Sequence, residues 1–203
     1  MKHCGAIILA AGRSQRMGRP KLSLPFDREH SFLSRIVSQY HAFGCHPLVV
    51  VVNPNEAHLP AILLEALPCR VFTVVNPQPE VGRFLSLQKG LQALEKPGPV
   101  FMHNVDHPFV NHQVLEILGR TAGKRSYASP EYEGRGGHPI LLGKALVQDL
   151  IDHTGEVPRL DHFLKSYKRA RVKVNDPGIH YNINTPDDYK AFFRAIHSAC
   201  IDF

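Results

Sequence analysis

Two kinds of hydrophobic pattern alternate along the first half of the chain. Four short runs rich in apolar residues predict strands, and they lie at residues 6–9, 48–52, 71–75 and 100–102. The runs at 6–9 and 48–52 are continuously apolar, as expected for strands covered on both faces. Between the four runs, apolar residues recur at the spacing of one helix face, over residues 32–43, 59–67 and 84–94. This alternation predicts a doubly wound α/β fold, with a mostly parallel sheet and helices on both of its faces.

The second half of the chain is less regular. Its strand-like segments lie at residues 126–129, 138–142 and 170–174. Its helical segments lie at residues 114–118, 144–151, 160–167 and 187–198. No internal repeat, low-complexity stretch or linker marks a boundary, so we expect one domain over residues 1–203.

The composition restricts the class of protein without choosing a function. Hydrophobic residues make up 43% and charged residues 21% of the chain, which is typical of a globular protein. The formal net charge of +6 favours anionic partners, which include nucleic acid, anionic membranes and phosphorylated small molecules. No run approaches the ~20 apolar residues of a membrane helix, and we interpret the apolar stretch at residues 5–11 as a buried strand rather than a signal peptide.

Four cysteines are scattered along the chain without a CxxC pair, at Cys4, Cys45, Cys69 and Cys200. This spacing argues against a zinc knuckle and against a disulfide framework. It indicates reduced thiols in a cytoplasmic protein.

The loop after the first predicted strand is the most informative segment. From Leu9 to Lys21 it combines small residues, two glycines and four basic side chains. Small residues let a backbone approach a ligand, and successive N–H groups can hold an anion at the carboxyl end of a strand. Arg16 and Lys21 could reach the oxygens of a triphosphate. The P-loop and dinucleotide fingerprints are both absent, and a solvated basic loop is the alternative.

In its sequence this loop resembles the signature loop of the MobA-like NTP transferases, and more narrowly that of the molybdenum cofactor cytidylyltransferases. The Leu-Ala-Ala-Gly form is similar to the branch that uses CTP, whereas the guanylyl branch usually carries Leu-Ala-Gly-Gly. The resemblance implies a Rossmann-like nucleotidyltransferase fold and catalytic roles for Arg16 and Lys21. It also implies nucleotide contacts from Leu9, Ala10, Ala11, Gly12, Arg13, Ser14, Gly18 and Lys21.

Asp106 lies four residues past the end of the fourth apolar run. A carboxylate at a strand end can hold Mg²⁺ against phosphates, although a helix cap or turn residue is the alternative. The residue resembles the metal-binding Asp of the family's Gly-Asp-Gln-Pro motif, with Val105 in place of Gly and His107 in place of Gln. A second alternative is a zinc site made by His103, Asp106 and His107.

Three later segments also resemble family motifs. Gly82 and Ser86 fit the Gly-rich entry to a helix and so imply nucleotide contacts, while Phe84 is interpreted as helix core. His138, in a Gly-His-Pro segment, is implied to bind the acceptor, and the alternative is a glycine turn before a strand.

The last of these motifs contains a departure from the family. Residues 182–188 are similar to its Asp-x-Asp-Thr-Pro-Glu-Asp, with Asn182 and Asn184 in place of both upstream Asp residues. An amide oxygen can ligate Mg²⁺ without bringing charge, so a second and weaker metal contact is expected from Asn184, with Asn182 as the alternative. Thr185 and Pro186 read as a helix start. We interpret the basic run at residues 165–173 as a solvent-exposed face rather than a surface that binds nucleic acid.

The resemblance implies in-line displacement at the α-phosphorus of an NTP, with CTP expected. The terminal phosphate of a molybdopterin-type cofactor would attack, pyrophosphate would leave, and Mg²⁺ would be the cofactor. A molybdoenzyme or its chaperone is the implied protein partner, and neither nucleic acid nor membrane is expected. Nucleotide would bind the half at about residues 1–110 and acceptor the half at about 111–203. The alternatives are a sugar- or polyol-phosphate nucleotidyltransferase and a non-catalytic regulatory protein that binds nucleotide.

Overall fold

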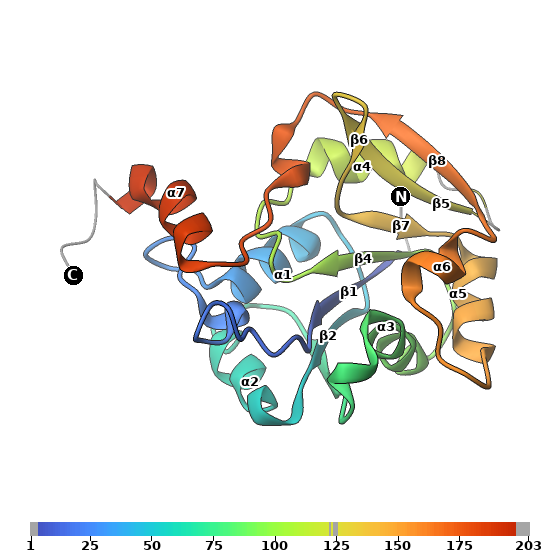
Figure 1. The fold of residues 1–203 in the computed structure, drawn as a ribbon, viewed down its shortest axis with the longest axis horizontal. Helices are drawn as coiled ribbons and strands as arrows, with labels where there is room; N and C mark the ends of the chain where they lie inside the picture. The colour runs from blue at the N-terminus through green and yellow to red at the C-terminus, as the bar shows by residue number, and fades with distance from the viewer. Residues whose placement is uncertain (1–3, 122, 124–125, 198–203) are drawn as a thin grey trace.

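The computed structural model describes residues 4–121, 123 and 126–197 (Figure 1). One sheet of eight strands runs through this part of the chain, in the order β3-β2-β1-β4-β7-β5-β6, with β8 paired to β5. The strands are β1 (Gly5–Ala10), β2 (Leu48–Val52), β3 (Val71–Val75), β4 (Val100–Asn104), β5 (Ser126–Tyr132), β6 (Arg135–Gly136), β7 (Ile140–Leu142) and β8 (Lys168–Lys173).

The helices are α1 (Phe32–Ala42), α2 (Leu59–Leu63), α3 (Arg83–Gln92), α4 (His112–Thr121), α5 (Lys144–Asp152), α6 (Leu160–Leu164) and α7 (Pro186–His197). Short 3-10 helices lie between them as η1 (Lys21–Ser23), η2 (Pro54–Glu56), η3 (Pro79–Val81) and η4 (Pro177–His180). None of the helices in the described residues has both the length and the apolar character that crossing a bilayer requires.

The sheet is mostly parallel, which confirms the predicted fold class. The pairs β1–β2, β2–β3, β1–β4 and β5–β8 are parallel, and β7 pairs antiparallel with both β4 and β5. The order changes direction at β1, because β2 lies on one side of it and β4 on the other. Such a switch point is where open α/β sheets bind ligands.

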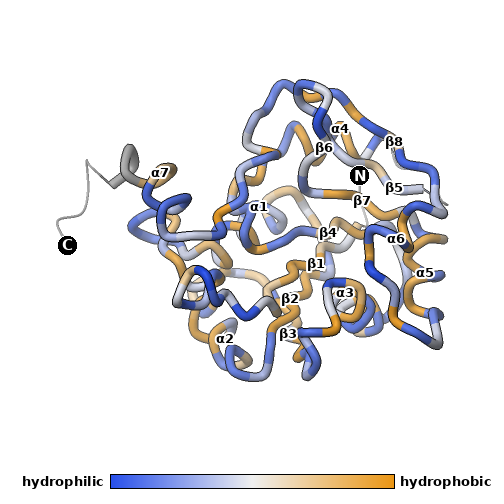
Figure 2. Tube along the Cα trace, in the orientation of Figure 1, coloured by the Kyte–Doolittle hydropathy of each residue, from blue (hydrophilic) through white to orange (hydrophobic). Residues whose placement is uncertain are grey.

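Alternate residues of the central strands face two separate cores. Ala6 and Ile8 of β1 pack with α1 and α4, whereas Ile7 and Leu9 pack with α3, α5 and α6. The arrangement of helices on the two faces is visible in Figure 1, and Figure 2 shows the apolar residues gathered in β1, β2 and β4. A Cβ on Gly90 would lie 2.8 Å from Val51 Cγ2, so α3 sits as close to the sheet as a glycine allows.

The predicted elements and the structure differ mainly at their ends. Helix α2 stops at Leu63 rather than Leu67, because Leu64 leaves helical dihedral angles, and Ile62 in it is 63% exposed. Helix α6 also ends early, at Leu164. The two-residue strand β6 was not predicted, since two residues carry no periodicity. Ser198, the predicted end of the last helix, lies outside the described residues.

The cysteines of the described residues are free thiols, as predicted. Cys4 and Cys45 are buried at the start of β1 and just before β2, with their Sγ atoms 3.4 Å apart. Cys69 is free and half-buried. Cys200 lies outside the described residues.

Candidate functional site

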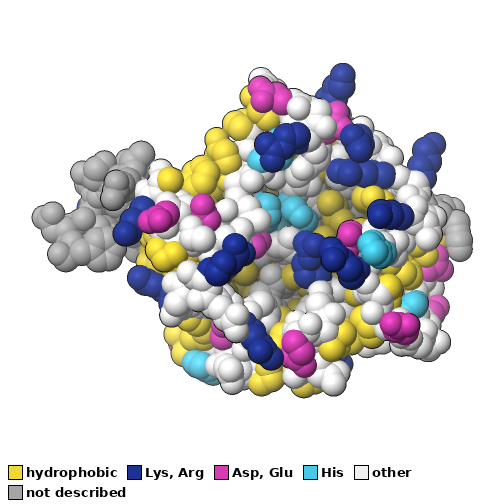
Figure 3. Space-filling view, viewed as in Figure 1, with side chains coloured by type: hydrophobic (Ala, Val, Ile, Leu, Met, Phe, Trp, Pro, Cys, Tyr) yellow, Lys and Arg dark blue, Asp and Glu magenta, His cyan; other side chains and the backbone are white. Residues whose placement is uncertain are grey.

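A pocket of about 770 Å³ opens where the carboxyl ends of β1 and β4 meet. Figure 3 shows a hollow on this face with Lys, Arg and His side chains around it. Strands β1 and β4 bring its two sides together, since Leu9 pairs with Asn104 and the N–H of Val105 donates to the carbonyl of Leu9 at 3.1 Å. The predicted site residues that line it are Leu9, Ala11, Gly12, Arg13, Ser14, Arg16, Lys21, Gly82, Ser86, Asp106, His138 and Asn184.

Two predicted nucleotide contacts, Ala10 and Gly18, do not line the pocket. Ala10 is the last residue of β1 and its side chain belongs to the core beneath α1. Gly18 has a φ of +73°, which a side chain rarely adopts, and its N–H donates to the carbonyl of Ser14 at 3.2 Å. Its structural role is to close the turn within the loop.

Ser14 organises the loop around the pocket. Its carbonyl also accepts from the N–H of Met17, and its Oγ accepts from the N–H of Lys21 at 3.3 Å. Among the described residues, no hydrogen bond occupies the backbone N–H groups of residues 12–16. Unoccupied N–H groups beside a pocket can bind an anion.

Lys21 joins the loop to two other segments of the pocket wall. Its Nζ donates to Asn184 Oδ1 at 2.6 Å and lies 3.5 Å from Asp106 Oδ2. The Lys21 side chain is only 12% exposed, and burial lowers the pKa of its ammonium group while Asp106 opposes that shift. The N–H of Ile183 donates to the carbonyl of Asp106 at 2.8 Å, which holds these segments together.

One carboxylate oxygen of Asp106, Oδ1, lies 3.7 Å from His107 Nε2, which is beyond hydrogen-bond distance. This oxygen is buried, and no hydrogen bond reaches it within the described residues. The same part of the chain contains no group of three His, Cys, Asp or Glu side chains arranged to hold a metal. A cation bound here would therefore have one protein carboxylate, with Asn184 as a neutral neighbour.

The zinc alternative is excluded by the hydrogen bonds of His103. Its Nε2 lies 2.6 Å from the carbonyl of His107, which can only accept, so Nε2 carries the proton. Its Nδ1 then accepts from the hydroxyl of Tyr40 at 3.0 Å. Both ring nitrogens are engaged in the core, and burial lowers the pKa of His103 to about 4.

His107 and His138 form a neutral pair in the wall of the pocket. Their ring centroids are 4.6 Å apart, and burial lowers the pKa of each to about 3. The amide of Asn104 donates to His138 Nε2 at 3.3 Å, so Nδ1 of this neutral ring carries the proton. His138 is therefore a neutral imidazole at neutral pH, and its buried Nδ1 has no hydrogen-bond partner among the described residues.

The β3–α3 connection forms a further wall of the pocket. Gly82 precedes α3 with a φ of +116°, and Ser86 Oγ accepts from Asn76 Nδ2 at 2.9 Å. Phe84 is buried against α6 in the core, as its helical spacing predicted.

Sequence patterns did not identify every residue of the wall. The lining also includes Gln15, Pro79, Arg83, Asn104, Val105, His107 and Asn182. Asn104 could have been found, because it ends β4 opposite Leu9 of the loop strand. Pro79 and Arg83 lie on a segment whose position is set by tertiary contacts.

The helix start predicted at Thr185 is confirmed, and it also positions Asn184. Thr185 Oγ1 accepts from the N–H of Asp188 at 3.1 Å, and α7 begins at Pro186. Asp188 Oδ2 accepts from the N–H groups of Asn184 and Thr185, each at 2.9 Å. These bonds lower the pKa of Asp188 and anchor the segment that carries the amide.

Comparison with protein families matches residues 6–172 to the MobA-like NTP transferase domain. The chain is 25% identical over 198 residues to the molybdenum cofactor cytidylyltransferase of Escherichia coli strain K12, covering 93% of this chain and 95% of that one. It is 24% identical over 194 residues to a probable molybdenum cofactor guanylyltransferase of Mycobacterium avium strain 104, with coverage of 93% and 94%.

Solved structures share the fold. A nucleotidyl transferase from Methanothermobacter superposes with a TM-score of 0.76 at 21% identity, covering 97% of this chain and 98% of that one. A protein of Mycobacterium tuberculosis H37Rv, solved in complex with manganese, superposes with a TM-score of 0.70 at 18% identity, covering 96% and 100%. At these identities the similarity establishes the Rossmann-like fold of nucleotidyltransferases.

Proposed function

Because the chain belongs to the MobA-like NTP transferase family, we propose that it transfers CMP from CTP to the terminal phosphate of a molybdopterin-type cofactor and releases pyrophosphate. One observation carries this proposal. Lys21 of the loop after β1 lies 3.5 Å from Asp106 after β4, in the pocket that the loop itself lines. A cation and a carboxylate are thus adjacent where a triphosphate would bind.

The proposed reaction is an in-line displacement. An oxygen of the acceptor phosphate attacks the α-phosphorus of CTP, the bond from that phosphorus to the bridging oxygen of the β-phosphate breaks, and pyrophosphate leaves. The backbone N–H groups of residues 12–16 and the exposed Arg16 would bind the phosphates, and Lys21 would stabilise the charge that develops. A phosphate nucleophile is already ionised at neutral pH, so no general base is needed.

A divalent cation fits the residues present. Asp106 Oδ1 is buried without a hydrogen-bond partner among the described residues, and carboxylate oxygens are the ligands that Mg²⁺ prefers. We propose Mg²⁺ held by Asp106, with Asn184 as a second, uncharged ligand. When bound, the ion supplies charge neutralisation on the phosphates.

The choice of CTP is supported by the Leu-Ala-Ala-Gly start of the loop. We further propose that the chain acts as one domain, with a nucleotide-binding half at about residues 1–110 and an acceptor-binding half at about 111–203 that includes His138. The pairing of β4 with β7 across that boundary supports this arrangement. A cytoplasmic location and a molybdoenzyme or its chaperone as partner remain predictions.

Pyrophosphate release tests the proposal directly. The purified chain is mixed with Mg²⁺ and each of CTP, GTP, UTP and ATP, with molybdopterin, with a sugar phosphate, with a polyol phosphate, or with no acceptor. We expect release only with CTP and molybdopterin. Release with a sugar or polyol phosphate instead would change the acceptor class. Nucleotide binding with no release for any pair would favour a regulatory role.

A further inference from the structure

A second cavity of about 440 Å³ adjoins the main pocket. The two share Arg13, Gln15 and Pro79 in their walls, so the second cavity continues the space next to the loop. A molecule whose phosphates occupy the loop could extend its other end into this cavity. In a nucleotide, that other end is the base.

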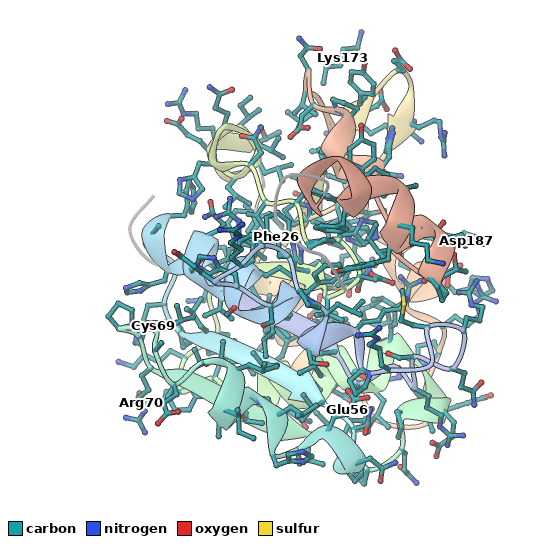
Figure 4. The ribbon with its side chains drawn as sticks, turned by 90° about the vertical axis from the view of Figure 1, so that its left-hand side faces the viewer. Phe26, Glu56, Cys69, Arg70, Lys173 and Asp187 are labelled. Atoms are coloured by element: carbon teal, nitrogen blue, oxygen red, sulfur yellow. The ribbon has the colours of Figure 1, made fainter. Side chains whose placement is uncertain are left out.

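The cavity contains a buried carboxyl group that the proposed mechanism does not use. Glu56 on η2 lines it and is only 8% exposed (Glu56 is marked in Figure 4). Its Oε2 is buried and has no hydrogen-bond partner among the described residues. A buried acceptor left without a donor is costly, and such groups are often completed by a ligand.

The surroundings of Glu56 hold its backbone, and its carboxyl forms no ion pair with a cation of the described residues. Asn53 Oδ1 accepts from the N–H groups of Asn55 and Glu56, at 3.0 and 3.2 Å, and this fixes the turn. The nearby guanidinium of Arg13 donates to Glu80 Oε2 at 3.1 Å on the exposed rim. Burial raises the pKa of Glu56, and a contact with Asn53 offsets part of that shift.

The remaining walls suit a planar ring. Pro54, Pro77 and Pro79 contribute apolar surface to the cavity. A carboxyl oxygen on such a wall accepts hydrogen bonds from N–H donors. The bases differ in the positions of their N–H donors. Cytosine has an exocyclic amine where uracil has a carbonyl oxygen. An acceptor facing that position therefore favours cytosine and repels uracil.

Building on the proposed function, we propose that Glu56 determines base specificity by accepting a hydrogen bond from the exocyclic amine of the bound base. The same group would accept from guanine, whose N–H donors lie on adjacent atoms. Glu56 thus selects amino-bearing bases against uracil, and the form of the loop selects between cytosine and guanine.

Calorimetry with CTP and UTP in the presence of Mg²⁺ tests the assignment without an acceptor. The unaltered chain should bind CTP about tenfold or more tightly than UTP, since one well-placed contact discriminates by about that factor. In Glu56→Gln the amide can present either its oxygen to cytosine or its NH₂ to uracil. The ratio of the Kd for UTP to the Kd for CTP should therefore fall toward one. Glu65→Gln is the matched control: Glu65 is exposed just after α2 and lines neither cavity, so this variant should keep the preference.

A measurement on the unaltered chain covers the case in which Glu56→Gln does not fold. The triphosphate of 2-pyrimidinone riboside, which lacks the exocyclic amine, should bind about tenfold more weakly than CTP. Equal binding of CTP and this analogue would overturn the role of Glu56, as would an unchanged CTP-to-UTP ratio in Glu56→Gln. Both results would leave the proposed function standing. Absence of binding by every nucleotide would reject both proposals.

Discussion

At the scale of single residues, a substitution of Asp106 tests whether the protein is a metal-dependent transferase or only binds nucleotide. Asp106→Asn keeps the size of the side chain and removes the charge that would hold the cation. We expect transfer to fall at least ~100-fold, the usual effect of losing one group that stabilises transition-state charge, with the circular dichroism spectrum unchanged.

The matched control is Asp187→Asn. Asp187 is exposed in the first turn of α7 and does not line the pocket (Figure 4). Its variant should keep normal turnover. Near-normal turnover in Asp106→Asn would remove that carboxylate from the catalytic site.

Asn184 offers a second test, because we propose it as the uncharged ligand of the cation. Asn184→Asp adds a negative charge beside Asp106, so we expect the Mg²⁺ concentration for half-maximal activity to fall several-fold. Lys21 limits the gain, since its Nζ already donates to the side chain at this position. Metal titrations of the variant and of Asn182→Asp measure the effect. An unchanged Mg²⁺ dependence in both would place neither residue near the cation.

At the scale of elements, the two glycines of the loop after β1 are expected to have different roles, one in the backbone conformation and one in contact with the ligand. Gly18 has a φ of +73°, whereas Gly12 does not lie in the left-handed region. Apart from the two chain neighbours, no described residue comes within 4 Å of a Cβ added to either glycine. Gly18→Ala should lower the free energy of unfolding by about 1 kcal/mol because alanine is strained there. Gly12→Ala should leave stability unchanged but weaken nucleotide binding several-fold, since Gly12 lines the pocket.

Thermal unfolding and calorimetry measure the two effects separately. We expect each variant to change one quantity. Gly18→Ala should change mainly the melting temperature, and Gly12→Ala should change mainly the Kd for CTP. A Gly12→Ala variant that binds CTP normally would show that the backbone of the loop does not approach the nucleotide.

At the scale of the whole molecule, the buried histidines make stability depend on pH. His103 has a pKa of about 4 in the folded chain, below the ~6.5 of an unfolded chain, because burial disfavours its charged form. The unfolded state therefore takes up a proton first as the pH falls. The stabilising contribution is present above about pH 6.5 and is lost as the pH falls toward 4. Between pH 7 and pH 5 the loss from His103 should be about 2 kcal/mol.

Denaturant unfolding at pH 7 and pH 5 tests this expectation, with His103→Gln as the comparison. Glutamine can still donate to the carbonyl of His107 and accept from Tyr40, yet it does not titrate. The variant should lose less stability than the unaltered chain over this interval. An equal loss in both would assign the pH dependence to other groups.

The order of strands and helices and the loop at Leu9–Lys21 were predictable because their determinants are local. Continuous apolar runs mark strands buried on both faces, and a run of glycines and cations between them needs no distant partner to be recognised. The helix start at Thr185 was local for the same reason, since its cap bonds span three residues. By contrast, the early end of α2 follows from dihedral angles at Leu64 that no periodicity records.

The sequence by itself determined the class of fold, the rim of the sheet at which the site forms and the residue types available there. Only the tertiary structure decided which of them meet. Lys21 and Asn184 lie 163 positions apart yet share a hydrogen bond, and Glu56 shares a cavity with Arg13. The physical reason is that apolar period and turn chemistry act within a few residues, whereas burial and charge pairing depend on which strands the sheet places side by side.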